Sequence, residues 1–332
     1  MPQADSRSEI RRAVELLLAG HVVAIPTETV YGLGADARNP AALTRIFSIK
    51  GRPADHPLIV HLAGDDHLER WAIDIPEIAW ELAEQFWPGP LTLILKRRPD
   101  VPDAVTGGQD TIGLRVPGHP MALALLREFA AAGGSGGIAA PSANRFGRIS
   151  PTSAQHVRDD LGDTVPLILD GGPCQVGIES TIVDLSREAP VILRPGMISA
   201  ATLSLVLGTS PRAAAAIAEA AAPRVSGSLE AHYAPRTPMS LVSSADLLAE
   251  VRRCHGAGQL LAVLSRQRPA ADVAHWIPSP LCARDYGHDL YANLRRLDEL
   301  AADRILVEAV SHEDDWVAVR DRLRRAAAGG GC

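Results

Sequence analysis

Apolar residues in the first two thirds of the chain alternate between a helical period and short buried runs. Residues 6–9 (SRSE) have the spacing of a capping box, and the apolar positions that follow share one helical face as far as Gly20. Asn39-Pro40 predicts the cap and first turn of a second helix, which reaches about Ile49. Strands are predicted at 22–25, 58–62, 91–96, 111–116, 138–140, 167–170, 181–185 and 191–194, and further helices at 76–86, 120–132, 153–161 and 200–207.

Strands interleaved with helices are typical of the α/β class. Several of the predicted strands are short and adjacent in sequence, which favours a mixed sheet over a purely parallel one. We therefore expect residues 1–208 to form one domain with an open, twisted mixed sheet and covering helices.

The pattern changes after residue 208. Residues 209–238 contain an alanine-rich stretch followed by SGSLEAHYAPRTP, without a regular period, and this predicts a linker that could close over the active site. From Met239 a second alternation begins. Its strands are predicted at 239–242, 260–264 and 304–310, with helices from Ala245, over 289–302 and from Asp314. Residues 239–328 are therefore expected to form a smaller, doubly wound, Rossmann-like α/β domain.

Composition limits the functional classes. With 46% hydrophobic residues, no apolar run of about 18 residues and no signal-peptide pattern, the chain is expected to be cytoplasmic and not to bind membranes. Its four cysteines are scattered, so neither a disulfide framework nor a zinc site is expected. The net charge is −6, all of it in residues 1–208, which argues against tight direct binding of nucleic acid.

Several apparent catalytic motifs lack the required context. Residues 32–37 fit G-x-G-x-x-A but lie well past the predicted strand and before the next helix, unlike a dinucleotide-binding turn. Residues 133–137 fit G-x-S-x-G but follow a helix, and the acidic run at 312–315 suits a helix start. Neither Lys50 nor Lys96 follows a glycine, so the chain has no P-loop.

A more informative set of residues follows the predicted strands. It comprises 26–34 (PTETVYGLG), 50–53 (KGRP), 113–117 (GLRVP), 140–144 (APSAN), 177–181 (GIEST) and 194–196 (RPG). In open α/β sheets, ligands bind where strand ends meet loops. Lys50, Arg52, Arg115 and Arg194, gathered there with hydroxyls and glycines, would suit a polyphosphate and a small carboxylate. From the residues alone, the sequence predicts a phosphate- or carboxylate-binding α/β enzyme.

These motifs carry a resemblance to a known family. PTETVYGLG, the K-x-R of KGR, the S-x-N of SAN, GLRVP and GIESTIVD resemble the YrdC-like domain of threonylcarbamoyl-AMP synthases over about 200 residues. HYAP and the second domain resemble the long form of that family more loosely. The resemblance implies a nucleotidyltransferase that makes threonylcarbamoyl-AMP and pyrophosphate from L-threonine, bicarbonate or CO2, and ATP. The product would pass to a tRNA threonylcarbamoyl-transfer complex for threonylcarbamoyladenosine formation.

The resemblance also assigns residues. Lys50 and Arg52 would be catalytic. ATP would contact Lys50, Arg52, His56, Thr111, Ser142, Asn144, Ser150, Arg194 and Tyr233, and threonine would contact Thr29, His61, Arg115, Ala140 and Ser180. No protein side chain is expected to bind metal, and Mg2+ would enter on the ATP phosphates. His56 departs from the asparagine of many relatives, and the charge of an imidazole depends on pH.

Two other functions stay open. YrdC-like domains also occur in hydrogenase-maturation carbamoyltransferases, but those are much larger and carry segments that this sequence lacks. A non-catalytic RNA-binding or regulatory module is the second alternative, which the acidic first half disfavours.

Overall fold

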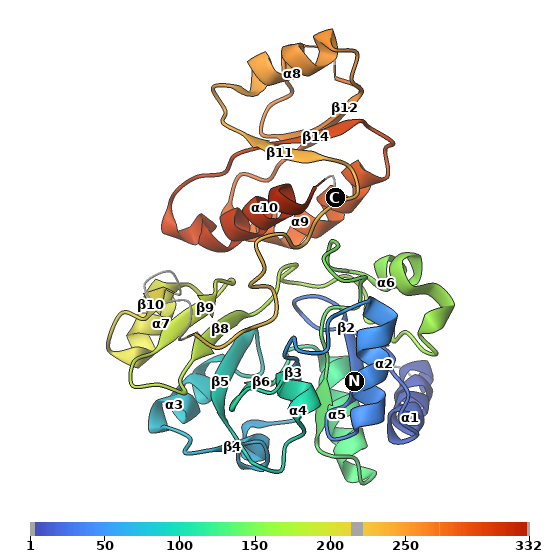
Figure 1. Ribbon diagram of the computed structural model, residues 1–332, viewed down its shortest axis with the longest axis vertical. Helices are drawn as coiled ribbons and strands as arrows, with labels where there is room; N and C mark the ends of the chain where they lie inside the picture. The colour runs from blue at the N-terminus through green and yellow to red at the C-terminus, as the bar shows by residue number, and fades with distance from the viewer. Residues whose placement is uncertain (1–3, 214–221, 272, 331–332) are drawn as a thin grey trace. The chain divides into compact units, whose positions relative to one another are not determined.

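The computed structural model describes residues 4–213, 222–271 and 273–330 and divides the chain into two compact units (Figure 1). The first unit comprises residues 1–146, 151–175 and 179–228. The second comprises residues 147–150, 176–178 and 229–332. No helix in the described ranges combines the length and apolar character needed to cross a bilayer.

A large mixed sheet forms the centre of the first unit. Its described strands are β1 (Val23–Ile25), β2 (Gly32–Asp36), β3 (Ile59–Leu62), β4 (Ala72–Ile73), β5 (Leu91–Arg97), β6 (Thr111–Arg115), β7 (Gly137–Ala139), β8 (Thr181–Asp184), β9 (Val191–Arg194) and β10 (Arg212–Ala213). Their order is β1-β2-β7-β3-β6-β5-β8-β9-β10, and β4 pairs with β5. The pairs β3–β6, β5–β8 and β9–β10 are parallel and the others antiparallel, so the predicted mixed α/β sheet is confirmed.

The two faces of this sheet bury different residues. Alternate residues of a strand point to opposite faces. Val60 of β3, Leu93 of β5 and Leu114 of β6 enter the largest hydrophobic cluster of the unit. The intervening His61 and Arg115, which are register partners on parallel strands, therefore point to the opposite face. Two polar side chains are thus buried on the side of the sheet away from the main core.

The helices of the first unit follow the caps in the sequence unevenly: the second helix begins and ends at its predicted caps, whereas the first begins before the capping box predicted at residues 6–9. They are α1 (Ala4–Leu18), α2 (Pro40–Lys50), η1 (Asp65–Arg70), α3 (Glu77–Phe86), α4 (Asp103–Thr106), α5 (Pro120–Ala131), α6 (Ala154–Leu161), η2 (Gly162–Thr164) and α7 (Ala200–Leu207). The Asn39 side chain caps α2 by accepting hydrogen bonds from two backbone N–H groups of the first turn. Gly51 ends α2 with φ +63°, the left-handed conformation that favours glycine.

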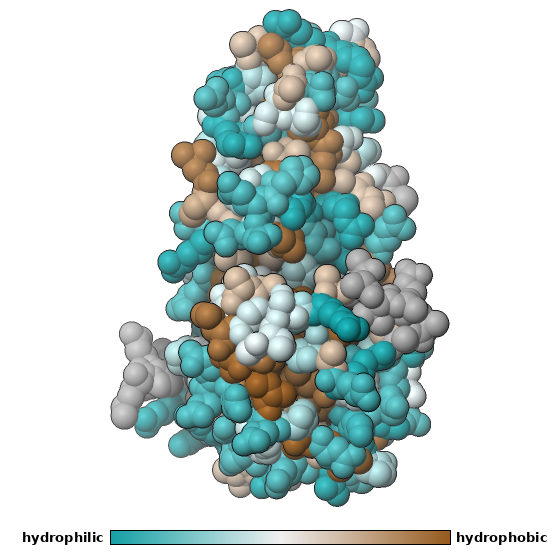
Figure 2. Space-filling model, turned by 90° about the vertical axis from the view of Figure 1, so that its left-hand side faces the viewer, coloured by the Kyte–Doolittle hydropathy of each residue, from teal (hydrophilic) through white to brown (hydrophobic). Residues whose placement is uncertain are grey.

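In α7, Leu205 is 85% exposed, and Figure 2 shows apolar side chains gathered on the face where this helix lies.

Part of the predicted linker is packed on the first unit. Residues 214–221 lie outside the described part of the chain. Residues 222–228, which we call the arm, belong to the first unit, and residues 229–238 belong to the second. Val225 of the arm is buried in a cluster with Ile94 and Ile182, which lie on the sheet face that also carries His61.

The second unit contains a four-stranded parallel sheet in its described residues. Its strands are β11 (Met239–Val242), β12 (Leu261–Ser265), β13 (His275–Pro278) and β14 (Arg304–Glu308), in the order β11-β14-β12-β13. Its helices are α8 (Leu247–Gly256), α9 (Ala283–Asp298), η5 (Asp314–Trp316) and α10 (Val317–Gly329). Figure 1 shows α8 on one face of the sheet and α9 and α10 on the other, which confirms the doubly wound class.

Some predicted elements differ from the structure. The strand expected at 167–170 is only an isolated bridge between Ala24 and Ile168. Strands β2 and β13 were not predicted, because GLGAD is rich in small residues and HWIP ends in proline. Helix α9 begins at Ala283, six residues earlier than expected. Gly32 and Gly34 lie inside β2, so residues 32–37 do not form a dinucleotide-binding turn.

Candidate active site

Lys50 lies at the last position of α2, where the glycine cap turns the chain toward Arg52. Its ammonium donates hydrogen bonds to the carbonyl oxygens of Ser142 (2.5 Å) and Asn144 (2.6 Å). Its side chain is buried, and burial, reinforced by the charge of Arg52, holds the pKa of Lys50 well below its ordinary value. The K-x-R and S-x-N motifs are therefore in direct contact.

Arg52 and Arg194 meet at Ser226 of the arm. Nη2 of Arg52 donates to Oγ of Ser226 (3.1 Å) and to the Pro57 carbonyl (2.9 Å). Nη1 of Arg194 donates to the Ser226 carbonyl (2.8 Å), while its Nη2 donates to Oγ of Ser180 (3.0 Å). Both guanidinium groups are buried. The hydroxyl oxygen of Ser226 accepts a hydrogen bond from one of them, and its carbonyl oxygen accepts one from the other.

Arg115 is held by a buried carboxylate. Its Nη2 lies 2.5 Å from Oε1 of Glu28, and both side chains are at most 8% exposed. Its Nη1 donates to Oγ1 of Thr29 (3.0 Å), and Oε2 of Glu28 accepts from the Gly118 N–H (2.9 Å). Nε of Arg115 also donates to the Gly89 carbonyl (3.2 Å), so Glu28, Thr29 and Gly89 together fix the orientation of the guanidinium plane.

His61 and Ser180 complete this part of the site. Burial, with a smaller contribution from the charge of Arg115, lowers the pKa of His61 to about 3, so the imidazole is neutral at physiological pH. Within the described residues, Nδ1 of His61 has no hydrogen-bond partner. Oγ of Ser180 hydrogen-bonds Oγ1 of Thr92 (2.7 Å). Both His61 and Ser180 can offer a hydrogen bond to a polar ligand.

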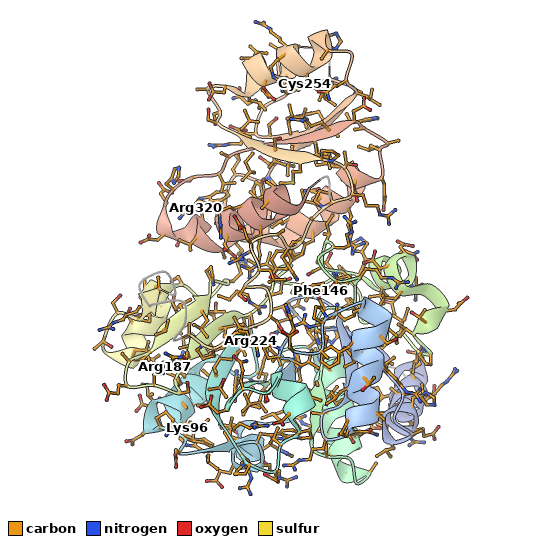
Figure 3. The ribbon with its side chains drawn as sticks, viewed as in Figure 1. Lys96, Phe146, Arg187, Arg224, Cys254 and Arg320 are labelled. Atoms are coloured by element: carbon orange, nitrogen blue, oxygen red, sulfur yellow. The ribbon has the colours of Figure 1, made fainter. Side chains whose placement is uncertain are left out.

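His56 and Arg52 both pack against Phe146, which is labelled in Figure 3. The His56 and Phe146 rings pack edge to face at 5.3 Å, and Cζ of Arg52 lies 5.6 Å from the Phe146 ring centroid. Burial, and then the charge of Arg52, lowers the pKa of His56 below its ordinary value. His56 is thus near the predicted phosphate-binding residues.

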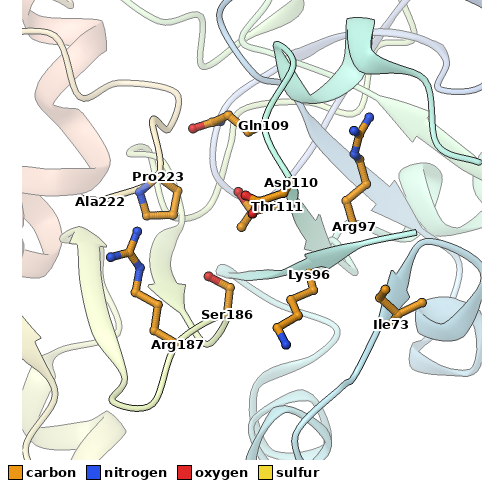
Figure 4. A pocket seen from close by; sticks show the side chains of 10 residues that line it. All are labelled: Ile73, Lys96, Arg97, Gln109, Asp110, Thr111, Ser186, Arg187, Ala222 and Pro223. Atoms are coloured by element: carbon orange, nitrogen blue, oxygen red, sulfur yellow. The ribbon is translucent and has the colours of Figure 1, made fainter. Parts of the chain in front are cut away.

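Three further predicted residues lie on other elements of the chain. Thr111 starts β6, four residues before Arg115, and lines an open cavity of about 470 Å³ (Figure 4). Ser150 belongs to the second unit, where its carbonyl accepts from Nε of Arg295 (3.5 Å). Tyr233 also belongs to the second unit and is 1% exposed. Thr111 also lines a small cavity with Pro57 and Ser226, both of which accept hydrogen bonds from Arg52, and the nucleotide contacts of all three residues stay predictions.

The motifs that follow the predicted strands lie on strands of opposite direction. Strand β7 runs antiparallel to β3, so Ala140 lies beside Ile59 rather than beside His61. The Gly32 strand pairs with Ser142 through an isolated bridge, which brings the PTETVYGLG loop next to the SAN motif. The site therefore extends across neighbouring strands on one face of the sheet.

Sequence reasoning missed three residues of this site. Glu28 could have been identified from the sequence, because it is an acidic residue inside a motif expected to be buried. Thr92 follows the first residue of β5, and nothing in the sequence separates it from an ordinary strand threonine. Ser226 lies in a segment without a regular hydrophobic period, and nothing in the sequence indicates its contacts with the two arginines.

The other apparent catalytic motifs also lack the structural context that their chemistry requires. Residues 133–137 connect α5 to β7, so the serine of G-x-S-x-G does not follow a strand. Among the described residues, no group of three or more His, Cys, Asp or Glu side chains could hold a metal ion. The fold and the site define an α/β protein whose buried lysine and arginine side chains suit anionic ligands.

Comparisons with known proteins agree with this class. A family model described as telomere recombination (Sua5/YciO/YrdC) matches residues 15–196, and a model of the threonylcarbamoyl-AMP synthase C-terminal domain matches residues 198–328. A Pyrococcus abyssi protein named threonylcarbamoyl-AMP synthase is 38% identical over 96% of this chain and 94% of its own length. A Bacillus subtilis protein of the same name is 38% identical over 97% and 93%.

A solved structure supports the same grouping. The structure of P. abyssi Sua5 complexed with L-threonine is 37% identical, has a TM-score of 0.89, and covers 96% of this chain and 94% of that one. The chain belongs to the threonylcarbamoyl-AMP synthase family.

Proposed function

We propose that this protein synthesises L-threonylcarbamoyladenylate from L-threonine, bicarbonate or CO2, and ATP, with release of pyrophosphate, for threonylcarbamoyladenosine modification of tRNA. Relatives at 38% identity over nearly the whole chain have the name of this activity, and one similar structure contains L-threonine. The observation that carries the proposal is the adjacency of two buried groups. Lys50, Arg52 and Arg194 can bind phosphates, and Arg115 with Thr29 and Ser180 can bind an amino acid.

The residue types suit these two substrates. A fixed guanidinium such as that of Arg115 matches the carboxylate of threonine, because two parallel N–H groups can face its two oxygens. The hydroxyls of Thr29 and Ser180 and the neutral imidazole of His61 can contact the amine and hydroxyl of threonine. The phosphates of ATP would contact Lys50, Arg52 and Arg194, with His56, Ser142 and Asn144 nearby. We keep Thr111, Ser150 and Tyr233 as proposed nucleotide contacts.

The chemistry needs no protein nucleophile. The deprotonated amine of threonine adds to CO2 and forms a carbamate, and a carbamate oxygen then attacks the α-phosphorus of ATP. The bond to the β-phosphate oxygen breaks, and pyrophosphate leaves with its electron pair. The protein positions the two substrates and stabilises the charge that develops on the phosphates, through Lys50, Arg52 and Arg194.

Magnesium would reach this site through the nucleotide. The described residues contain no carboxylate and histidine cluster suited to a metal, so we expect Mg2+ to be bound by the ATP phosphates and derive no step from it. The product would be passed to a tRNA threonylcarbamoyl-transfer complex, and we expect the protein to act in the cytoplasm.

The arm gives this proposal a conformational step. Ser226 contacts Arg52 and Arg194 through its hydroxyl and its carbonyl, and phosphate oxygens would compete for the same N–H groups. We propose that the arm and the residues after it close over the site and limit access of water to the product. Deletion of residues 226–238 should increase unproductive ATP hydrolysis or abolish synthesis. If neither rate changes, this segment is a passive connection.

Pyrophosphate release decides the reaction class. The full chain is incubated with ATP, Mg2+ and bicarbonate, with and without L-threonine, and L-serine and L-valine serve as matched controls. We expect release that depends on L-threonine. Salt-sensitive RNA binding without threonine-dependent release would instead support the non-catalytic RNA-binding alternative.

A further inference from the structure

Thr92 is a buried polar residue that the proposed reaction has not yet used. It lies on β5 and is 0% exposed. The next residue, Leu93, enters the main hydrophobic cluster, so Thr92 points to the opposite face of the sheet, which also carries His61. Its Oγ1 lies 2.7 Å from Oγ of Ser180, the residue directly before the neighbouring strand β8 (Figure 1). A strand hydroxyl therefore contacts a residue that we expect to bind threonine.

Packing fixes the direction of the Thr92 hydroxyl. Its methyl carbon Cγ2 lies 3.6 Å from the position that a Cβ would take on Gly113 of β6. Its hydroxyl faces β8, which pairs with the other edge of β5. A β-branched side chain is stiff about χ1, so these two contacts hold it in one orientation.

Ser180 also accepts hydrogen bonds from Arg194. Nη2 of Arg194 donates to Oγ of Ser180 (3.0 Å), and its Nε donates to the Ser180 carbonyl (3.1 Å). A guanidinium has donors only, so the first of these bonds uses one lone pair of the Ser180 hydroxyl. The bond to Thr92 then uses either the second lone pair or the Ser180 proton, according to which hydroxyl donates.

Burial decides between these two arrangements. In the part of the chain that the structure describes, Oγ1 of Thr92 has Ser180 as its single hydrogen-bond partner. If Ser180 donated, the Thr92 proton would be buried without an acceptor, which is unfavourable. If Thr92 donates, both lone pairs of Ser180 are occupied and the Ser180 proton is available to a ligand. An acceptor atom on that ligand then completes the hydrogen bonds of both hydroxyls.

We propose that Thr92 is a positioning residue that makes Ser180 a hydrogen-bond donor toward a negatively charged oxygen of the amino-acid substrate. This inference rests on the proposed function. A hydroxyl that accepts from a guanidinium and from a second hydroxyl is polarised, which strengthens the bond that its own proton forms. With both lone pairs occupied, it cannot accept from the threonine ammonium. The oxygen that it contacts belongs to the carboxylate of threonine or to the carbamate formed from it.

Two measurements on the full chain test this role and distinguish the two oxygens. Calorimetry measures L-threonine affinity in bicarbonate-free buffer, and pyrophosphate release with bicarbonate gives kcat and KM. Thr92→Val removes the hydroxyl and keeps the branched shape. If the oxygen belongs to the carboxylate, this variant should bind threonine about three- to tenfold more weakly. If it belongs to the carbamate, threonine affinity should stay unchanged and kcat should fall by a similar factor.

Two matched variants separate the hydroxyl from the packing. Thr92→Ser keeps the hydroxyl and loses the methyl, so it should retain most of the wild-type affinity and turnover. Thr106→Val removes another buried hydroxyl, which donates to the Asp103 carbonyl in α4 (3.4 Å), and should change neither quantity. If Thr92→Val does not fold, Thr92→Ala lacks the same hydroxyl and replaces it in both measurements.

A double-mutant cycle shows whether Thr92 acts through Ser180. Adding Thr92→Val to Ser180→Ala should cause little further loss, because the hydroxyl that Thr92 orients is already absent. Losses that multiply would overturn the proposal, and so would a folded Thr92→Val variant with wild-type affinity and turnover. A wild-type chain that neither binds threonine nor releases pyrophosphate would instead contradict the proposed function, and the role of Thr92 with it.

Discussion

The two units bury positive charge in different ways. In the second unit, Arg322 is fully buried, lies 2.8 Å from Asp321, and places its Cζ 5.4 Å from the ring centroid of Tyr233. In the first unit, the ammonium of Lys50 is bonded to two backbone carbonyls and, within the described residues, lies in no ion pair. A carboxylate cancels the charge of its partner, whereas carbonyl dipoles orient a cation and leave its net charge in place. In its protonated form Lys50 therefore attracts an anion, whereas Arg322 serves the packing of its own unit.

Arg115 lies between these two cases. Its charge is compensated by Glu28, yet the pair leaves the guanidinium oriented and flanked by the hydroxyl of Thr29. Such a residue suits a ligand that carries both a carboxylate and an ammonium. The uncompensated Lys50 suits a polyphosphate. The proposed threonine-binding part of the site therefore has a compensated positive charge, and the proposed phosphate-binding part has an uncompensated one.

Removing a phosphate-binding charge should have the largest effect. We expect Arg52→Ala to lower threonine-dependent pyrophosphate release by about 10²–10³, judged from the loss of single donors in other active sites. Arg11→Ala, at an exposed arginine on α1, is the matched control and should retain full activity. Thermal unfolding verifies that both variants are folded. Full turnover by the Arg52 variant would remove this residue from the site.

Breaking the compensated pair should act mainly on threonine. In Glu28→Gln one acceptor oxygen becomes an NH2 donor, so the amide can accept from Arg115 or from the Gly118 N–H but not from both, and the buried guanidinium loses its compensating charge. We expect KM for threonine to rise about tenfold or more with a smaller change in kcat, and the free energy of unfolding to fall by about 3–5 kcal/mol. Glu28→Asp should restore part of both. If stability falls while KM for threonine is unchanged, Glu28 has a structural role only.

The pH dependence of nucleotide binding tests the state of Lys50. Burial lowers the pKa of this ammonium, and a bound polyphosphate should raise it again because it favours the charged form. Between the free and bound pKa, ATP binding therefore takes up as much as about one proton, and affinity falls as pH rises through that range. Calorimetry in buffers of different ionisation enthalpy measures this uptake, with Lys50→Met as control. Equal enthalpies in all buffers would show that Lys50 is already charged.

Local chemistry made much of the fold predictable. Asn39, Pro40 and Gly51 specify the start and end of α2, and this places the K-x-R motif at the end of a helix. Short apolar runs located β5, β8 and β9 to within a residue or two. The prediction of a strand at 167–170 is wrong, because this segment pairs only with Ala24, through an isolated bridge that no ladder continues.

The site was less predictable because it depends on strand direction and on distant packing. No local pattern shows that β7 is antiparallel to β3 and so brings Ser142 toward Lys50. The contacts of Ser226 depend on Val225, whose burial is decided by apolar residues on strands far away in sequence. Motif matching located the charged residues, and tertiary structure determined which groups hold them.

The burial of Val225 also bears on how the first unit can be produced alone. The matched YrdC-like segment ends at residue 196, before the arm. A recombinant fragment that stops there would leave Ile94, Ile182 and Leu193 without the side chain that covers them. Exposed apolar strands of this kind promote self-association, so a fragment that extends to Ser228 should stay monodisperse at concentrations where the shorter one aggregates.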